Sequence, residues 1–211
     1  MTDFDVPTPR GVARVTLDRP SGPPVALLVL GHGAGGGVDT PDLRAVRTAT
    51  LAVGCAVARV TQPYRVLGRK APPAAVALDE AWVAVTAAVR AKVGVDVPLV
   101  VGGRSSGARV ACRTGRALGA VGVVALAFPL HPPGRPEKSR AAELDPELHT
   151  LVVNGDRDPF GLPSPAGLVR VAVRPGEQHD LRRDPAGAAA EVVAWLRDLP
   201  GIPSFNSANL A

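Results

Sequence analysis

The sequence predicts an α/β protein whose mostly parallel sheet is covered by helices on both faces. Short apolar runs, the usual form of strands buried on both faces, recur along the 211 residues. Stretches with the apolar spacing of helices separate these runs, and such alternation favours parallel strands joined by crossover helices. A hydrophobic fraction of 46% is enough to build one sizeable core. We expect a single domain over residues 1–211, with its core at about 12–199 and a loosely packed tail at 200–211.

The predicted elements follow one another in a regular order. Residues 13–17 alternate between apolar and polar, which indicates a half-buried strand, placed at a sheet edge. Thr40-Pro41 is typical of a helix start, with a capping residue before a proline at the first helical position. Further strands are expected at residues 25–30, 56–60, 99–101, 121–128, 151–153 and 169–173, and further helices at about 78–89, from 108 onward and at 184–196.

The segment Gly103-Arg104-Ser105-Ser106-Gly107 matches the pattern G-x-S-x-G, with Ser105 at its centre. It lies between a predicted strand and a predicted helix, the setting that a nucleophile elbow requires. Glycines permit the sharp turn and close backbone approach that expose the central side chain. Ser105 is therefore the candidate nucleophile, and the alternative is a serine that only forms a turn. We expect Ser106, which is off-centre in the pattern, to cap the helix or pack.

Polar and glycine-rich segments follow the other predicted strands, at the edge where sheets of this kind bind ligands. GHGAGGG follows residue 30, NGDRDPFG follows residue 153 and RPGEQHD follows residue 173. The chain thus supplies a serine, then an acid, then a histidine, each just beyond a strand. This is the chain order of the catalytic triads of α/β-hydrolases.

Six segments in order resemble the α/β-hydrolase superfamily, and within it the dienelactone-hydrolase-like group. That group includes testis-expressed protein 30 and the hydrolase-like subunit of the nonspecific lethal histone-acetyltransferase complex. The resemblance covers about residues 12–199, and its most specific parts are GHGAGGG, PYRVLGRKAPP, GGRSSGAR, FPLHPPGRPEK, NGDRDPFG and GEQHDL.

The resemblance implies an α/β-hydrolase fold without a large cap domain, and a role for each matching residue. Ser105 would be the nucleophile, Asp158 the acid and His179 the base. The backbone N–H groups of Ser106 and Ala34, with Gly33 close to the latter, would form the oxyanion hole. The candidate residues for lining the substrate site are His32, Gly35, Tyr64, His131 and Phe160.

Several of these assignments have competing interpretations. Asp156 is an alternative to Asp158, but the pattern G-x-x-D from Gly155 selects Asp158, and Asp156 is expected to bond loop backbone. For His32 a structural hydrogen bond is preferred to catalysis. For His131 a place in the pocket and a packed loop position are equally open.

Other ligand classes find little support in the sequence. Gly31, Gly33 and Gly36 satisfy G-x-G-x-x-G, but the helix begins later and the next strand offers no acid, which argues against a dinucleotide site. The histidines lack ligand spacing, so we expect no metal and no cofactor. The net charge of +5 is scattered along the chain, which disfavours nucleic acid. No apolar run reaches the length of a membrane span. The start does not resemble a secretory signal, so a cytoplasmic location is expected.

The sequence therefore predicts a cytoplasmic serine hydrolase that cleaves small acyl esters through an acyl-enzyme intermediate. Its partner would be a small acyl substrate, while the oligomeric state stays open. The segment 130–150 is too short for a large lid, which favours a shallow, open site. Two alternatives remain. One is a weakly catalytic or non-catalytic interaction module, and the other is an acyltransferase or a non-ester hydrolase using the same residues. Cys55 and Cys112 are expected to be buried rather than bridged.

Overall fold

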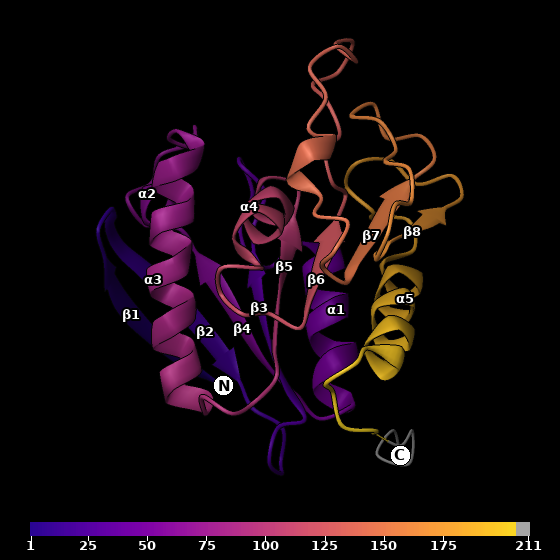
Figure 1. Ribbon diagram of the computed structural model, residues 1–211. Coiled ribbons are helices and arrows are strands. Elements are labelled where there is room, and N and C mark those ends of the chain that lie inside the picture. Colours follow the sequence, from indigo (N-terminus) through magenta and orange to yellow (C-terminus); the bar gives the residue numbers. More distant parts are fainter. Residues whose placement is uncertain (206–211) are drawn as a thin grey trace.

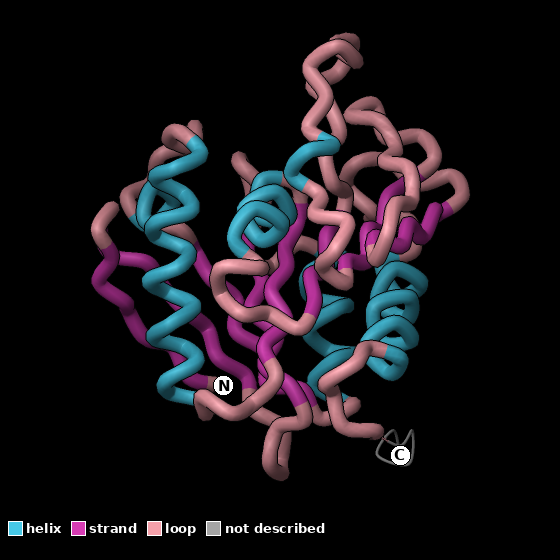
Figure 2. Tube along the Cα trace, in the orientation of Figure 1, coloured by secondary structure: helices cyan, strands magenta, loops and turns pink. Residues whose placement is uncertain are grey.

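The predicted α/β fold is confirmed by the computed structural model, which describes residues 1–205. One eight-stranded sheet runs through the molecule, with helices on both faces (Figures 1 and 2). The strand order is β1-β2-β4-β3-β5-β6-β7-β8. The end of the predicted tail, residues 206–211, lies outside the described residues.

The strands and helices have the following bounds. The strands are β1 (Thr2–Thr8), β2 (Gly11–Asp18), β3 (Ala26–Gly31), β4 (Cys55–Thr61), β5 (Leu99–Arg104), β6 (Gly122–Leu126), β7 (Thr150–Gly155) and β8 (Val169–Arg174). The helices are α1 (Pro41–Ala52), α2 (Pro63–Val66), α3 (Ala75–Val93), α4 (Ser106–Thr114) and α5 (Pro185–Asp198), with a 3₁₀ turn, η1 (Ala141–Glu143).

The strands from β3 to β8 are parallel, and their alternate side chains enter two separate cores. Leu27 and Val29 pack with the helices α3 and α4 on one face. Leu28 and Leu30 pack with α1 and α5 on the other. Because both faces of β3 are covered, its apolar run is continuous, as the sequence predicts.

The order of the strands in the sheet reverses at β3, and this reversal positions the functional site. β3 pairs with β4 on one side and β5 on the other. The segment after β3 leads to α1 on one face, whereas the segment after β5 leads to α4 on the opposite face. The carboxyl ends of β3 and β5 are therefore the point where sheets of this kind bind ligands. Figure 2 shows loops gathered beyond this edge.

One expectation about the ends of the chain needs correction, and two elements, β1 and α2, were not anticipated. The strand predicted at residues 13–17 is not at the edge, because β1 covers it as an antiparallel partner. Phe4 and Val6 of β1 alternate with polar residues, but the acids and Pro7 obscured this strand in the sequence. The short helix α2 was not anticipated. In the described part of the tail, Phe205 is buried against the α1 and α5 core, whereas residues 200, 201, 203 and 204 are exposed.

Two further sequence expectations concern the cysteines and membrane-spanning segments. Cys55 and Cys112 are both buried and unbridged, as predicted. Across residues 1–205, every helix is too short or too polar to cross a bilayer.

Candidate active site

The turn between β5 and α4 holds Ser105 in an uncommon backbone conformation, with φ 54° and ψ −110°. Non-glycine residues rarely adopt positive φ, and such strain costs about 1–3 kcal/mol. A Cβ on Gly103 would lie 2.5 Å from the carbonyl oxygen of Gly31, and one on Gly107 would lie 2.5 Å from its carbonyl carbon. The two glycines of the motif are therefore needed because the elbow packs directly on the end of β3.

The structure brings Ser105, His179 and Asp158 into one hydrogen-bonded chain. Ser105 Oγ lies 2.9 Å from His179 Nε2, and His179 Nδ1 lies 2.8 Å from Asp158 Oδ2. Since a carboxylate only accepts, Nδ1 carries the proton, and Nε2 presents its lone pair to the hydroxyl. This tautomer allows Nε2 to remove the serine proton.

The carboxylate of Asp158 is fully enclosed, and both of its oxygens have partners. Oδ1 accepts a hydrogen bond of 2.9 Å from the backbone N–H of Phe160. The Phe160 ring also stacks on the His179 imidazole, with 4.1 Å between ring centroids. The loop after β7 carries both Asp158 and Phe160 and is called the acid loop below. It contacts the imidazole at Nδ1 and over one face of the ring.

The glycine-rich loop after β3 lies beside the elbow. Two of its carbonyl groups accept hydrogen bonds from the side chains of His32 and Tyr64. His32 is buried; its Nε2 accepts from the backbone N–H of Gln62 at 3.1 Å. Its Nδ1 therefore carries the proton and donates to the carbonyl of Gly33 at 2.8 Å. Tyr64 Oη donates to the carbonyl of Ala34 at 2.7 Å. His32 and Tyr64 thus fix two successive peptide groups.

Fixing these carbonyls also fixes the direction of the N–H groups across the same peptides. In a trans peptide the C=O and N–H point in opposite directions. With the carbonyl of Gly33 turned toward His32, the N–H of Ala34 faces the other way. The N–H of Ser106 opens α4, where helix geometry leaves it without an intrahelical acceptor. A Cβ on Gly33 would lie 3.6 Å from Ser105 Cβ, so the loop and the serine are close neighbours.

The remaining sequence candidates lie around this centre. Gly35 is exposed, and a Cβ there would meet open space. His131 packs against Gly161 of the acid loop, and its backbone N–H donates to the carbonyl of Phe160 at 3.0 Å. Asp156 is exposed and accepts from the N–H of Gly176 at 2.7 Å, away from the imidazole.

Three residues that the sequence analysis did not single out support the loops. The buried amide of Asn154 bonds the backbone N–H and C=O of Phe128 and the carbonyl of Gly161, which links the ends of β6 and β7. The buried carboxylate of Glu177 accepts from the N–H groups just before α5, which closes the loop that carries His179. Arg104, the third residue, precedes the serine. Only their tertiary contacts distinguish these residues from ordinary loop positions.

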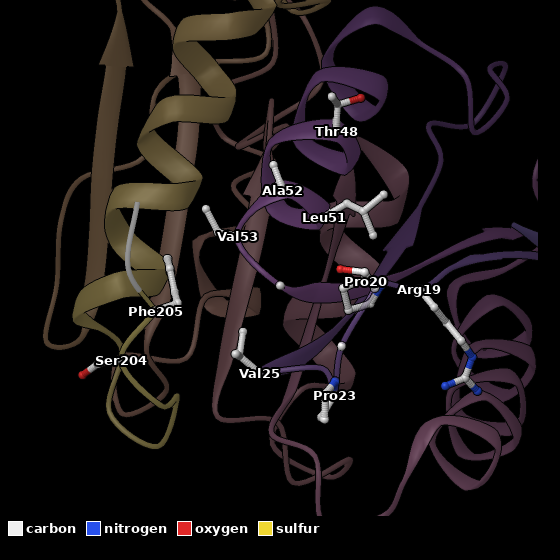
Figure 3. A pocket seen from close by; sticks show the side chains of 13 residues that line it. Arg19, Pro20, Pro23, Val25, Thr48, Leu51, Ala52, Val53, Ser204 and Phe205 are labelled. Atoms are coloured by element: carbon white, nitrogen blue, oxygen red, sulfur yellow. The ribbon is translucent and has the colours of Figure 1, made fainter. Parts of the chain in front are cut away.

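Several hollows in the described part of the chain are lined by residues outside the triad. One of about 270 Å³ is bordered by Tyr64, Leu67, Pro72 and Leu78. Another of about 810 Å³, shown in Figure 3, is lined by Val25, Gly54 and Phe205. Val25 and Gly54 precede β3 and β4, so this second hollow lies at the opposite end of the sheet from Ser105. Within residues 1–205, no three histidine, cysteine or acidic side chains gather as a metal site would require.

Comparison with known proteins agrees with this fold. The model of a family described as an alpha/beta hydrolase domain matches residues 24–174. A search of curated protein sequences finds no significant match.

Solved structures of low sequence identity share the fold. One is an α/β serine hydrolase without a lid from Xanthomonas campestris, with 20% identity, a TM-score of 0.74 and 96% coverage of both chains. Est1E from Butyrivibrio proteoclasticus has 14% identity and a TM-score of 0.74, over 94% of this chain and 99% of that one. An esterase from Pyrobaculum calidifontis has 18% identity and a TM-score of 0.67, over 92% and 84% of the two chains.

Proposed function

The chain belongs to the alpha/beta hydrolase family, and on this premise we propose that it is a serine hydrolase that cleaves small carboxylic esters. The observation that carries the proposal is the continuous chain from Ser105 Oγ through His179 to Asp158. Its nucleophile sits on a strained turn, its base has the required tautomer, and its acid is enclosed. A serine that only forms a turn needs none of these features.

The reaction proceeds in two half-reactions. Ser105 Oγ attacks the ester carbonyl carbon while His179 Nε2 takes the hydroxyl proton. The tetrahedral intermediate then collapses, the C–O bond to the alcohol breaks, and His179 returns the proton to the departing alcohol. Water repeats the sequence on the acyl-serine and releases the acid. Asp158 stays ionised throughout and stabilises the imidazolium that forms in each half-reaction.

Negative charge develops on the carbonyl oxygen, and we assign its stabilisation to the N–H groups of Ser106 and Ala34. His32 and Tyr64 support this assignment because they hold the carbonyls of Gly33 and Ala34 away from the serine. Donors fixed before the reaction need no reorganisation during it, and one such donor is worth about 3 kcal/mol.

The substrate class follows from the lack of a covering domain over the described part of the site. Between β6 and β7, where the chain rises above the sheet in Figure 1, η1 is the one short helical turn. We therefore propose short-chain esters, with no cofactor and a small acyl compound as the partner. The six motif segments support a place in the dienelactone-hydrolase-like group, and we retain the cytoplasmic location as part of the proposal.

A fluorophosphonate probe tests the nucleophile directly. Wild type and Ser106→Ala should react covalently, whereas Ser105→Ala should not. Ser106→Ala is the matched control, because it removes the adjacent hydroxyl but keeps the backbone N–H. Equal labelling of Ser105→Ala, or no labelling of folded wild type, would overturn the proposal.

The length preference is tested with p-nitrophenyl esters. Acetate and butyrate esters should be cleaved with higher kcat/KM than the palmitate ester. Much faster cleavage of palmitate would show that the site is not shallow.

A further inference from the structure

Arg104 ends β5 directly before the nucleophile, yet its side chain points into the protein rather than to solvent. Only 13% of the side chain is exposed. Its Nε lies 3.0 Å from Oδ2 of Asp42, in the first turn of α1. The Asp42 side chain is completely buried. The residue beside the nucleophile is therefore anchored to a helix on the far side of the glycine-rich loop.

The other nitrogens of the guanidinium reach two further parts of the site. Nη2 donates a hydrogen bond of 3.1 Å to the backbone carbonyl of His179. Nη1 lies against the glycine-rich loop, since a Cβ on Gly33 would come within 3.0 Å of it. The Arg104 guanidinium thus contacts Asp42 of α1, the loop that carries His179 and the glycine-rich loop beside Ser105.

The energetics do not favour a purely stabilising role for this pair. Burial raises the pKa of the Asp42 carboxyl, and the Thr40 hydroxyl and then the Arg104 guanidinium oppose that rise only in part. Burying two charges requires removing their water, and well-packed apolar residues are often at least as stabilising as a buried ion pair. Stability alone therefore does not explain why the pair is there, whereas the three contacts of the guanidinium supply an explanation.

The base depends on such support because a loop carries it. His179 lies between β8 and α5, and Leu181, two residues on, has a positive φ of 45°. Glu177 fixes the ends of this loop to each other, through bonds that do not involve the elbow. Arg104 bonds the backbone of His179 itself and is covalently joined to Ser105. It therefore ties the base to the nucleophile by a short, rigid route.

We infer that Arg104, held by Asp42, is a positioning residue that sets the placement of His179 relative to Ser105. The inference rests on the proposed function, since it concerns the same serine and histidine. Arg104 acts through backbone and has no contact with substrate in this assignment. A misplacement of about 1 Å between reacting groups can reduce the rate about 100-fold.

The test compares Arg104→Met with Arg113→Met in the full chain. Arg113 is a matched control because it is similarly buried, at 19% exposure, and pairs with Asp79 away from the serine. For p-nitrophenyl acetate, kcat should fall about 10- to 100-fold in Arg104→Met, with KM changed less than about twofold. Arg113→Met should lose comparable thermal stability but keep its kcat. Equal kcat in the two variants would overturn the inference.

Rescue separates positioning from general loss of structure. Arg104→Ala should regain part of its kcat when methylguanidinium is added, whereas Arg113→Ala should show no response. The double variant Asp42→Asn/Arg104→Met should be no slower than Arg104→Met. Either change alone already breaks the same contact between Arg104 and Asp42. Full additivity of the two effects, or no rescue, would count against a linked pair.

A readout that does not need turnover distinguishes this inference from the proposed function. The hydrogen-bonded Nδ1–H proton of His179 should give a downfield NMR signal in wild type and Arg113→Met. The signal should be lost or broadened in Arg104→Met. If wild type proved inactive but this pattern held, the proposed function would fail and the positioning role would stand. An unchanged signal in Arg104→Met would overturn the role even in an active enzyme.

Discussion

The ring of Phe160 stacks on the imidazole of His179, with 4.1 Å between centroids and 31° between the ring planes. The same residue donates its backbone N–H to Asp158, so one position supports both the acid and the base. The stacking restricts rotation of the imidazole about its bond to Cβ and shields one face from water. The orientation that presents Nε2 to Ser105 is therefore stabilised before substrate binds.

Replacing Phe160 should slow the reaction without unfolding the protein. Aromatic pairs contribute about 0.5–1.5 kcal/mol beyond the area they bury, so Phe160→Ala should lower kcat about threefold to tenfold. Steady-state kinetics on p-nitrophenyl acetate measure the change. Leu162→Ala, which removes an exposed apolar side chain from the same loop, is the control and should leave kcat unchanged. Equal rates for wild type and Phe160→Ala would show that the stacking has no catalytic effect.

Asp158→Asn should nearly abolish turnover while the fold persists. An amide in place of the carboxylate favours the wrong tautomer, in which Nε2 carries the proton and cannot accept one from Ser105. In serine proteases with the same arrangement this change lowers kcat about 10⁴-fold. Asp156→Asn is the matched control, because its oxygen can still accept from Gly176 and it lies away from the imidazole. If Asp156→Asn were the slower variant, the acid would have been assigned to the wrong residue.

Tyr64→Phe removes one hydrogen bond from the loop that carries the proposed oxyanion donor. The Ala34 carbonyl loses its partner, and the N–H groups of the loop gain freedom to rotate. A typical hydrogen bond has a net value of about 1 kcal/mol, so kcat should fall about fivefold. The rate constant for fluorophosphonate labelling should fall in parallel, since that reaction also develops charge on an oxygen. Unchanged values of both would mean that Tyr64 does not hold the loop.

Local patterns in the sequence predicted the fold and the neighbourhood of the site. The run of buried strand residues, the Thr40-Pro41 start and the G-x-S-x-G turn each depend on neighbours in the chain, so they can be recognised without tertiary contacts. The order of Ser105, Asp158 and His179 was equally visible. Their contact is a property of the structure, which places them within hydrogen-bonding distance.

The features that the sequence did not reveal depend on contacts between distant segments. Arg104 and Asp42 each resemble an ordinary charged surface residue, and only folding buries both together. Asn154 follows the apolar part of β7 and resembles a turn residue, whereas its amide spans two strand ends. β1 was missed for another reason, because an edge strand buries few residues and shows a weak apolar alternation.

His32 should make the protein less stable in weak acid. Burial lowers the pKa of its imidazole, and the charge of Arg65 lowers it further. The hydrogen bond to the Gly33 carbonyl offsets only part of this lowering. The folded state therefore holds neutral His32 at a pH where the unfolded chain, with an ordinary pKa near 6.5, already binds a proton. The contribution of His32 to the free energy of unfolding is complete above pH 6.5 and is lost as the pH falls from 6.5 toward the folded pKa.

Urea unfolding of wild type and His32→Asn at pH 7.5 and pH 5.5 measures this contribution. Asparagine can still donate to the Gly33 carbonyl but has no titrating group, so it removes the protonation while keeping one of the two hydrogen bonds. Wild type should lose more stability between the two pH values than His32→Asn, with each unit of lowered pKa worth about 1.4 kcal/mol. Because the two proteins differ at this one residue, the comparison isolates the effect of His32. An equal loss in both would show that His32 takes up its proton in the folded state as easily as in the unfolded chain.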